Sequence, residues 1–203
     1  LGYAAVESEV VRIASQGARV FQELGHTVEE AGLVLEDPFP HFWNIFSSDV
    51  YAVYGHILDD KSRESGLSDY GRRALEEASK VKGSDYSRGL RYIAMLKDQM
   101  NRLMERYDLL LTPTMAVPAF PVGQRPKAIA GREVNPFWGF LPFTFPFNMT
   151  GQPAASIPCG FSADGMPIGL HIVGRYGEEA TVIRASAAFE KARPWIHLRP
   201  PDS

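Results

Sequence analysis

The residues with the clearest chemical potential are Cys159, Asp164 and His171, which follow one another in one short stretch. By type alone they form a Cys-His-Asp set, in which an imidazole activates a thiol for nucleophilic attack. However, Cys159 stands between Pro158 and Gly160, and a lone cysteine in such a place is more commonly a small buried side chain. His171 alternates with apolar residues and is expected to face one side of a sheet. We therefore interpret Cys159 as a bystander.

Other nucleophiles and cofactor sites have little support in the sequence. Ser47 and Ser48 lie in an apolar helical pattern without glycine, so neither hydroxyl has an evident oxyanion hole. The five histidines are scattered, and none stands at metal-ligand spacing. There is no Gly-rich phosphate loop, no dinucleotide fingerprint, and no CxxC, HExxH or G-x-S-x-G motif. The sequence thus predicts no metal and no cofactor.

The composition limits the class of protein and its partners. Of 203 residues, 45% are hydrophobic and 22% charged, which is typical of a folded globular chain. Lys plus Arg is 21 against Asp plus Glu 24, so the chain lacks the basic excess that direct nucleic-acid binding requires. One cysteine cannot form an internal disulfide, and no apolar stretch approaches the ~18 residues of a membrane span. We expect a cytoplasmic protein that binds neither nucleic acid nor membrane.

Periodic patterns predict the elements that would position a site. Apolar residues at three-to-four spacing predict helices at 7–24, 43–58, 67–81, 84–107 and 178–192. The aromatic residues of 43–58 are expected to fill a core. Strands are predicted at 26–35, 108–112, 154–158 and 168–173, the last two joined by a hairpin turn at 162–165. The expected fold class is α/β, with a mixed β-sheet flanked by helices.

Two stretches rich in proline and glycine are expected to shape a pocket. Prolines punctuate a long loop over 113–136, and loops of more than about 12 to 15 residues are usually functional or disordered. In 145–161, Gly151 supplies backbone freedom and Pro153 fixes φ, which predicts a loop held rigidly against a strand.

The ordered combination of several stretches is similar to the C-terminal half of the amidase signature family. These stretches are LGYAAVESEV with ELGHTVEE, YDLLLTPTMAVPAFPVG, PFTFPFNMTGQPAASIPCGFSADGMPIGLHIVGR and ATVIRASAAFEKARPW. The resemblance implies a mixed sheet wrapped by helices and amide hydrolysis by a Ser-cis-Ser-Lys triad. The two serines of that triad lie in a Gly/Ser-rich signature, and the Lys lies further upstream. This chain has no GGSSGG-like segment. Residues 1–203 are therefore expected to be the C-terminal portion of a single amidase signature domain, numbered from inside a longer protein, with no catalytic residue.

The resemblance also implies that this chain supplies the far wall of the substrate pocket. The candidates come from a strand end, from the following loop and from the second helix: Thr112, Pro113, Thr114, Leu141, Phe143, Asn148, Trp43 and Phe46. The alternative is that the aromatic residues fill core while Thr112 and Asn148 only tie backbone together.

One position helps to choose a substrate class. In the glutamine-using component of tRNA-dependent amidotransferases, an Asp stands where this chain has Leu141, and that Asp can hold the ammonium group of glutamine. An apolar residue there favours a neutral or aromatic amide. Three functions stay open: part of an amide hydrolase, part of the glutamine-using component of a tRNA-dependent amidotransferase, or a non-catalytic interaction module. The expected partners are a small amide, the N-terminal half of the same protein and a second copy of the chain.

Overall fold

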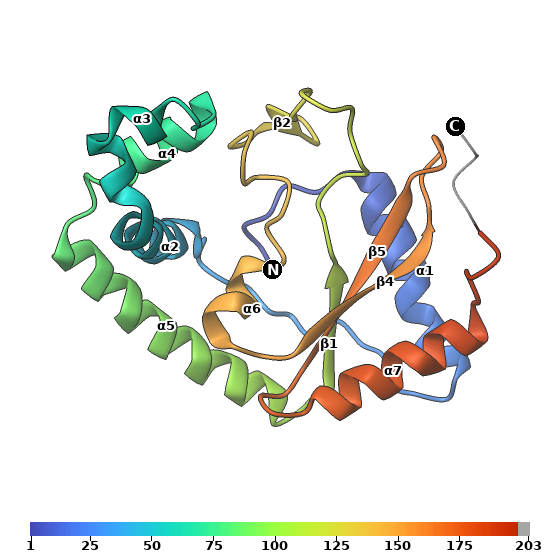
Figure 1. Ribbon diagram of the computed structural model, residues 1–203. Helices are drawn as coiled ribbons and strands as arrows, with labels where there is room; N and C mark the ends of the chain where they lie inside the picture. Colours follow the sequence, from blue (N-terminus) through green and yellow to red (C-terminus); the bar gives the residue numbers. More distant parts are fainter. Residues whose placement is uncertain (199–203) are drawn as a thin grey trace. The chain divides into compact units, whose positions relative to one another are not determined.

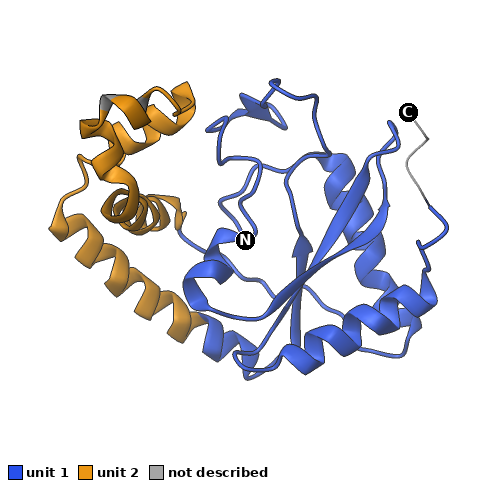
Figure 2. Cartoon of the chain, viewed as in Figure 1, with its two compact units in different colours: residues 1–36, 100–203 blue, residues 37–99 orange. Residues whose placement is uncertain are grey.

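The computed structural model describes residues 1–198, except the side chains of Lys61 and Glu64. The chain divides into two compact units, shown in different colours in Figure 2. Unit 1 comprises Leu1–Glu36 and Met100–Ser203, and unit 2 comprises Asp37–Gln99.

A three-stranded sheet is the centre of unit 1 (Figure 1). Its strands are β1 (Leu109–Pro113), β4 (Ala154–Phe161) and β5 (Pro167–Gly174), in the order β1-β5-β4. Both pairings are antiparallel. The turn between β4 and β5 closes with a hydrogen bond from Ser162 N–H to the Met166 carbonyl, 2.8 Å, which confirms the predicted hairpin.

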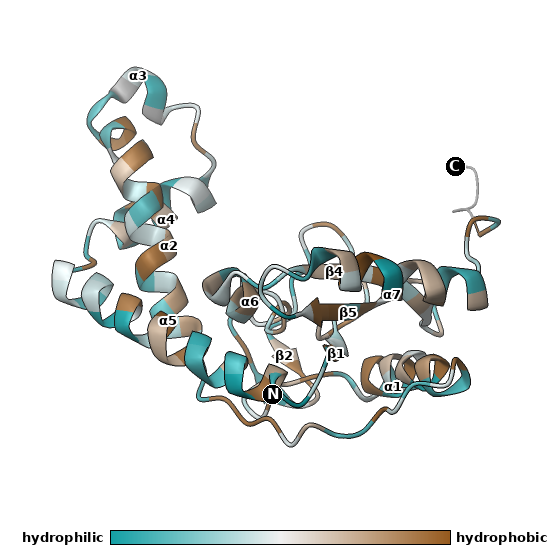
Figure 3. Cartoon of the chain, turned by 90° about the horizontal axis from the view of Figure 1, so that it is seen from below, coloured by the Kyte–Doolittle hydropathy of each residue, from teal (hydrophilic) through white to brown (hydrophobic). Residues whose placement is uncertain are grey.

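Strand β5 is buried because it lies between the other two strands. Leu170, Ile172 and Val173 expose at most 1% of their surface, and the strand is predominantly apolar (Figure 3). The registers place Leu111 and Ala155 on either side of Ile172, so these three side chains share one face of the sheet.

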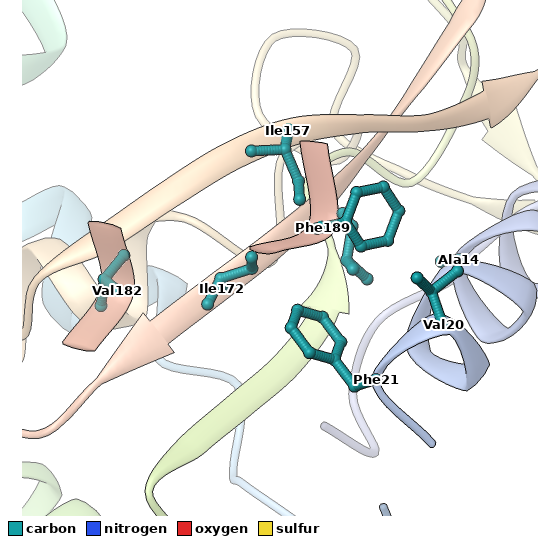
Figure 4. Packing of buried hydrophobic residues seen from close by; sticks show 8 residues of the cluster. Ala14, Val20, Phe21, Ile157, Ile172, Val182 and Phe189 are labelled. Atoms are coloured by element: carbon teal, nitrogen blue, oxygen red, sulfur yellow. The ribbon is translucent and has the colours of Figure 1, made fainter. Parts of the chain in front are cut away.

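Helices α1 (Ser8–Glu23) and α7 (Glu179–Ala192) cover that face. Their apolar residues meet those of β4 and β5 in one cluster (Figure 4). Within it the rings of Phe21 and Phe189 lie 5.8 Å apart. The predicted fold class is confirmed: a small sheet flanked by helices, each helix burying an apolar stripe.

The residues 145–150 form the short helix α6 (Phe145–Thr150), where the sequence predicted a loop. Pro146 is tolerated in its first turn because the N–H that proline lacks would have no partner in the helix. Gly151 ends the helix with φ +76° and donates its N–H to the Phe147 carbonyl, 2.8 Å. The glycine and proline signals were those of helix ends, and the six residues between them were too few to show a helical period.

The long loop after β1 contains a hairpin of two short strands, β2 (Ala128–Ile129) and β3 (Arg132–Glu133). The two residues between them, Ala130 and Gly131, have φ of +48° and +75°. Positive φ at both positions is the signature of a tight hairpin turn. The Ala130 N–H donates to Glu7 Oε1, 2.9 Å, which ties the turn to the start of α1.

The predicted strand at 26–35 is wrong, because the described structure assigns these residues neither strand nor helix. Leu35 N–H donates to the Leu1 carbonyl, 2.9 Å, which ties the end of this segment to the start of the chain. Gly32, with φ +60°, interrupts the extended conformation. An extended segment needs a neighbouring strand to become part of a sheet, and no strand pairs with residues 26–35 in the part of the chain that the structure describes.

Unit 2 is helical. It contains α2 (Phe39–Tyr54), the 3₁₀ turn η1 (Gly55–Asp59), α3 (Lys61–Glu64), α4 (Asp69–Ala78) and the first part of α5 (Gly83–Met104). The interpretation of the α2 aromatics as core was wrong: Ser47 is the buried residue of this helix, and Phe46 is 40% exposed. Within the unit, α2 meets α5 through stacked rings of His41 and Tyr92, 4.2 Å apart.

Candidate substrate wall on the polar face of the sheet

A row of polar side chains crosses the sheet face opposite to α1 and α7. The registers align Thr112 on β1, His171 on β5 and Ser156 on β4. Thr112 Oγ1 donates to the Pro113 carbonyl, 2.9 Å, and lies 3.4 Å from His171 Nδ1. Because the only Thr112 hydroxyl proton is used by the carbonyl, we assign the ring proton of His171 to Nδ1.

Burial determines the charge of His171. Its side chain is 5% exposed, and the Phe147 ring of α6 packs against it edge-on at 5.5 Å. Removal from water lowers the pKa of His171 from 6.5 to about 4. The imidazole is therefore neutral at physiological pH.

Beside this row, two hydroxyls meet over a glycine. Thr114 Oγ1 and Ser156 Oγ are 2.7 Å apart. A Cβ atom at Gly169 would lie 2.6 Å from the Thr114 oxygen and 2.7 Å from the Ser156 oxygen. Only glycine therefore lets the two strands bring these hydroxyls together.

The loop that precedes α6 is linked to the continuation of β1. Ala116 N–H donates to the Phe140 carbonyl, 2.9 Å, and the Tyr3 hydroxyl donates to the Pro142 carbonyl. Leu141 is half-buried, whereas Phe143 is 4% exposed and packs in a core cluster with Ala116.

The predicted pocket candidates fall into groups. Thr112, Pro113 and Thr114 lie together at the end of β1, with Thr112 buried and the other two half-buried. Asn148 is exposed on α6. Trp43 and Phe46 belong to α2 in unit 2, where their ring centroids are 6.4 Å apart.

The Cys-His-Asp set is not assembled. Cys159 lies on the helix-covered face, where a Cβ at Gly17 of α1 would be 2.8 Å from its Cβ, while His171 lies on the opposite face. Asp164 is exposed in the hairpin turn. Burial raises the pKa of the Cys159 thiol to about 11, so the thiol is protonated at neutral pH. The interpretation of Cys159 as a bystander agrees with this geometry.

The serine pair in α2 is also unsuited to nucleophilic attack. Ser47 Oγ donates to the Trp43 carbonyl, 2.5 Å, and Ser48 Oγ donates to the Asn44 carbonyl, 2.7 Å. Both hydroxyl protons are therefore held by the turn of helix that precedes them.

Sequence reasoning missed the Thr114–Ser156 contact. The residue types carried a weak signal, because Thr112 and Thr114 stand two positions apart, and residues two apart in an extended segment point to the same side. Which residues would face one another depends on the strand registers, which the sequence does not specify.

The described residues contain neither a metal-binding cluster nor a helix that could span a membrane. No group of three or more His, Cys, Asp or Glu side chains there could hold a metal ion. In the same part of the chain, no helix is both long and apolar enough to cross a membrane.

Comparison with known proteins identifies the family. The family model described as Amidase matches residues 1–183. The chain belongs to the amidase family. The resemblance noted in the sequence is thereby confirmed.

Relatives of this amidase chain are found among curated proteins. Acylamidase from Rhodococcus erythropolis is 32% identical over an alignment of 204 positions, which covers 100% of this chain and 43% of that protein. The A component of glutamyl-tRNA(Gln) amidotransferase from Oceanobacillus iheyensis is 29% identical over an alignment of 224 positions, which covers 96% of this chain and 44% of that protein.

Solved structures share the fold. A bacterial aryl acylamidase of the amidase signature family matches 98% of this chain and 45% of its own, with a TM-score of 0.83 and 28% identity. A 6-aminohexanoate cyclic dimer hydrolase matches 98% of this chain and 44% of its own, with a TM-score of 0.74 and 28% identity. This amidase chain thus spans less than half the length of these relatives.

Proposed function

We propose that the chain is the C-terminal part of one amidase signature domain, and that the complete amidase hydrolyses a carboxylic amide to an acid and ammonia or an amine. The observation that carries this proposal is that acylamidase relatives match 98% to 100% of the chain within 43% to 45% of their own length. The nucleophile, its bridging serine and its lysine would lie outside these 203 residues, which fits the lack of an assembled Cys-His-Asp set here.

The substrate would be a neutral amide with an apolar or aromatic group. Residues 134–163, which contain Leu141, α6 and β4, include no Asp, Glu, Lys, Arg or His. A wall built from this segment offers no counter-charge to an ammonium or a carboxylate, and burying such a group without a partner is costly. In unit 1, the wall would consist of Thr112, Pro113, Thr114, Leu141 and Asn148. Trp43 and Phe46 of unit 2 are separate candidates for contact with the substrate. Phe143 would support it from the core.

A component of a tRNA-dependent amidotransferase is the second candidate, supported by the relative from Oceanobacillus iheyensis. The uncharged segment argues against it, because glutamine carries both an ammonium and a carboxylate. The leading proposal includes a cytoplasmic location, because the chain has a single cysteine and so no internal disulfide. It also includes self-association of the isolated chain, because β1 and β4 are edge strands of the sheet.

A fluorophosphonate probe tests the proposal because it labels an activated serine without requiring the right amide. We would label this chain alone, and a chimera in which it replaces the aligned segment of the Rhodococcus erythropolis acylamidase. We expect stoichiometric labelling of the chimera and none of the isolated chain, measured by intact mass. An unlabelled chimera would refute the proposal, and labelling of the isolated chain would mean that it contains its own nucleophile.

The substrate class is tested at Leu141 in the same chimera. Leu141→Asp should lower kcat/KM for a neutral anilide by about 10- to 100-fold, because the carboxylate must be desolvated beside an apolar group. Leu141→Asn is the control, since asparagine has the shape of aspartate and no charge. Equal losses in both variants would show that shape matters at this position and charge does not.

A further inference from the structure

The polar face of the sheet carries hydrogen-bonding atoms that the neighbouring side chains do not use. They belong to four side chains from three adjacent strands, called here the polar row: Thr112, Thr114, Ser156 and His171. Residues directly opposite one another on paired strands share a face of the sheet. The registers pair His171 with both Thr112 and Ser156, and the Thr114 hydroxyl contacts that of Ser156, so the row lies on one face.

The imidazole of His171 leaves one acceptor unused. Its Nδ1 carries the ring proton and lies 3.4 Å from Thr112 Oγ1, so Nε2 holds a lone pair. No group within the described residues is bonded to Nε2. The buried side-chain nitrogen that lacks a partner in this part of the chain is Nδ1 of a different residue, His41. Nε2 of His171 therefore reaches the surface of the sheet, where it can accept a hydrogen bond.

The hydroxyls of Thr114 and Ser156 leave one donor unused. Each hydroxyl has one proton, and the 2.7 Å contact between the two oxygens takes up one of them. In the part of the chain that the structure describes, neither oxygen has another partner. Since Ser156 is exposed, the second proton can be donated to a ligand on this face.

An amide group matches these two unused positions. Its carbonyl accepts from a hydroxyl, and its N–H donates to an imidazole nitrogen. A carboxylate has no proton for Nε2, and an ammonium has no lone pair for the hydroxyl proton. Burial lowers the pKa of His171 to about 4, so at neutral pH the polar row offers neither ion a counter-charge. The row thus favours a neutral group that is both donor and acceptor.

We propose that the polar row binds a second, non-reacting carboxamide of the substrate, with a hydroxyl of Thr114 or Ser156 donating to its carbonyl and its N–H donating to His171 Nε2. This inference rests on the proposed function and narrows its substrate class to amides whose acyl group ends in a carboxamide. The carboxamide on the row is not the one cleaved, because no hydrogen bond joins the Ser156 hydroxyl to the imidazole within the described residues, so this serine has no base.

The position of the row favours the substrate as its ligand. Phe147 of α6 packs edge-on against His171, and Asn148, the next residue, is a candidate for the substrate wall. Pro113, another candidate, stands between the two threonines of the row. The competing ligand is a backbone peptide group from the part of the amidase outside this chain, which has the same donor and acceptor. In that case the row would be out of reach of the substrate.

A series of three anilides tests the proposal in the acylamidase chimera described above. Their acyl chains end in a carboxamide, a methyl ketone or an isopropenyl group, which have nearly the same shape, and spacers of several lengths are compared. The ketone lacks the N–H, and the isopropenyl group lacks the carbonyl as well. Each lost hydrogen bond should lower kcat/KM by about 3- to 10-fold. Equal values for the three anilides at every spacer length would overturn the proposal.

A pair of double variants tests the hydroxyl donor. Removing one hydroxyl leaves the proton of the other for the ligand, so both must be removed, in Thr114→Val/Ser156→Ala. The ratio of kcat/KM for the ketone to that for the isopropenyl anilide should then fall from about 3 to 10 to about 1. Thr114→Ser/Ser156→Thr, which exchanges the two hydroxyl residues, should keep the ratio. An unchanged ratio in the first variant would contradict the assigned donor.

The imidazole nitrogen gives a readout that does not require activity. In a chimera with ¹⁵N-labelled histidine, the Nε2 resonance of His171 is assigned by its loss in His171→Gln. It should move upfield when a carboxamide analogue binds whose anilide nitrogen is replaced by a methylene group, because Nε2 then accepts a hydrogen bond. The corresponding isopropenyl analogue should leave it in place. A resonance that stays unshifted up to the solubility limit of the carboxamide analogue would refute the site.

The two proposals fail in different ways. A chimera that is labelled by the fluorophosphonate but hydrolyses the three anilides equally keeps the proposed function and removes the carboxamide site; the peptide group would then be the ligand of the row. A chimera whose His171 nitrogen shifts but which is not labelled does the reverse. Loss of both observations counts against both.

Discussion

The neutral state of His171 predicts that the folded chain loses stability in acid. Its pKa is lowered from 6.5 to about 4 by burial, so the unfolded chain binds this proton more tightly than the folded one. The stabilising difference is fully present above pH 6.5 and is lost as the pH falls from 6.5 toward 4. No charged side chain contributes to this shift, whose cause is desolvation alone.

The size of the effect follows from the two pKa values. A group whose pKa is 6.5 in the unfolded chain and about 4 in the folded chain makes the free energy of unfolding about 2 kcal/mol lower at pH 5 than at neutral pH. Below pH 4 the loss approaches about 3 kcal/mol. For a chain of this size, 2 kcal/mol corresponds to a melting temperature lower by roughly 4 to 8 °C.

Two measurements check this prediction. The C2 proton of His171, followed by NMR from pH 8 to pH 5, should not titrate in the folded chain. The free energy of unfolding of the wild type minus that of His171→Gln, whose amide cannot ionise, should fall by about 2 kcal/mol between pH 7.5 and pH 5. A ring that titrates near 6.5, or a difference that is constant with pH, would refute the reasoning from burial.

Two further predictions concern the thiol and the strained turn. The pKa of Cys159, raised from 9.0 to about 11, should make its alkylation by iodoacetamide at pH 7.5 about 100-fold slower than in denaturant; equal rates would show that the thiol is not buried. Ala130→Asn should raise the free energy of unfolding by about 0.5 to 1 kcal/mol, because asparagine tolerates the φ of +48° better than alanine does. Thermal melting checks this, and a lower melting temperature would mean that the turn carries no strain.

Several elements could be predicted from the sequence because their signals are local. The residues of α1, α5 and α7 repeat their apolar positions with a helical period, and the Asp164–Gly165 turn marks the hairpin of β4 and β5. The six residues of α6 were too short to show a period. The segment 26–35 was predicted to be a strand, but no strand pairs with it among the described residues.

The candidate site was predicted less completely because it depends on pairing. Thr112 and Thr114 were named from the end of β1, but their partners Ser156 and His171 came from strands more than forty residues away, at separations of 42 and 59 positions. Gly169 carried no recognisable signal, since its role is to leave space between two side chains of neighbouring strands.

By itself, the sequence determined the family, the helices and strands with strong periods, and the absence of a Gly/Ser-rich catalytic signature, because all of these are recorded in residue order and type. Only the tertiary structure decided that Cys159 and His171 lie on opposite faces, that His171 is neutral, and that β4 has a free edge. These properties arise from strand register and from exclusion of water, which exist only after segments distant in the chain have packed together.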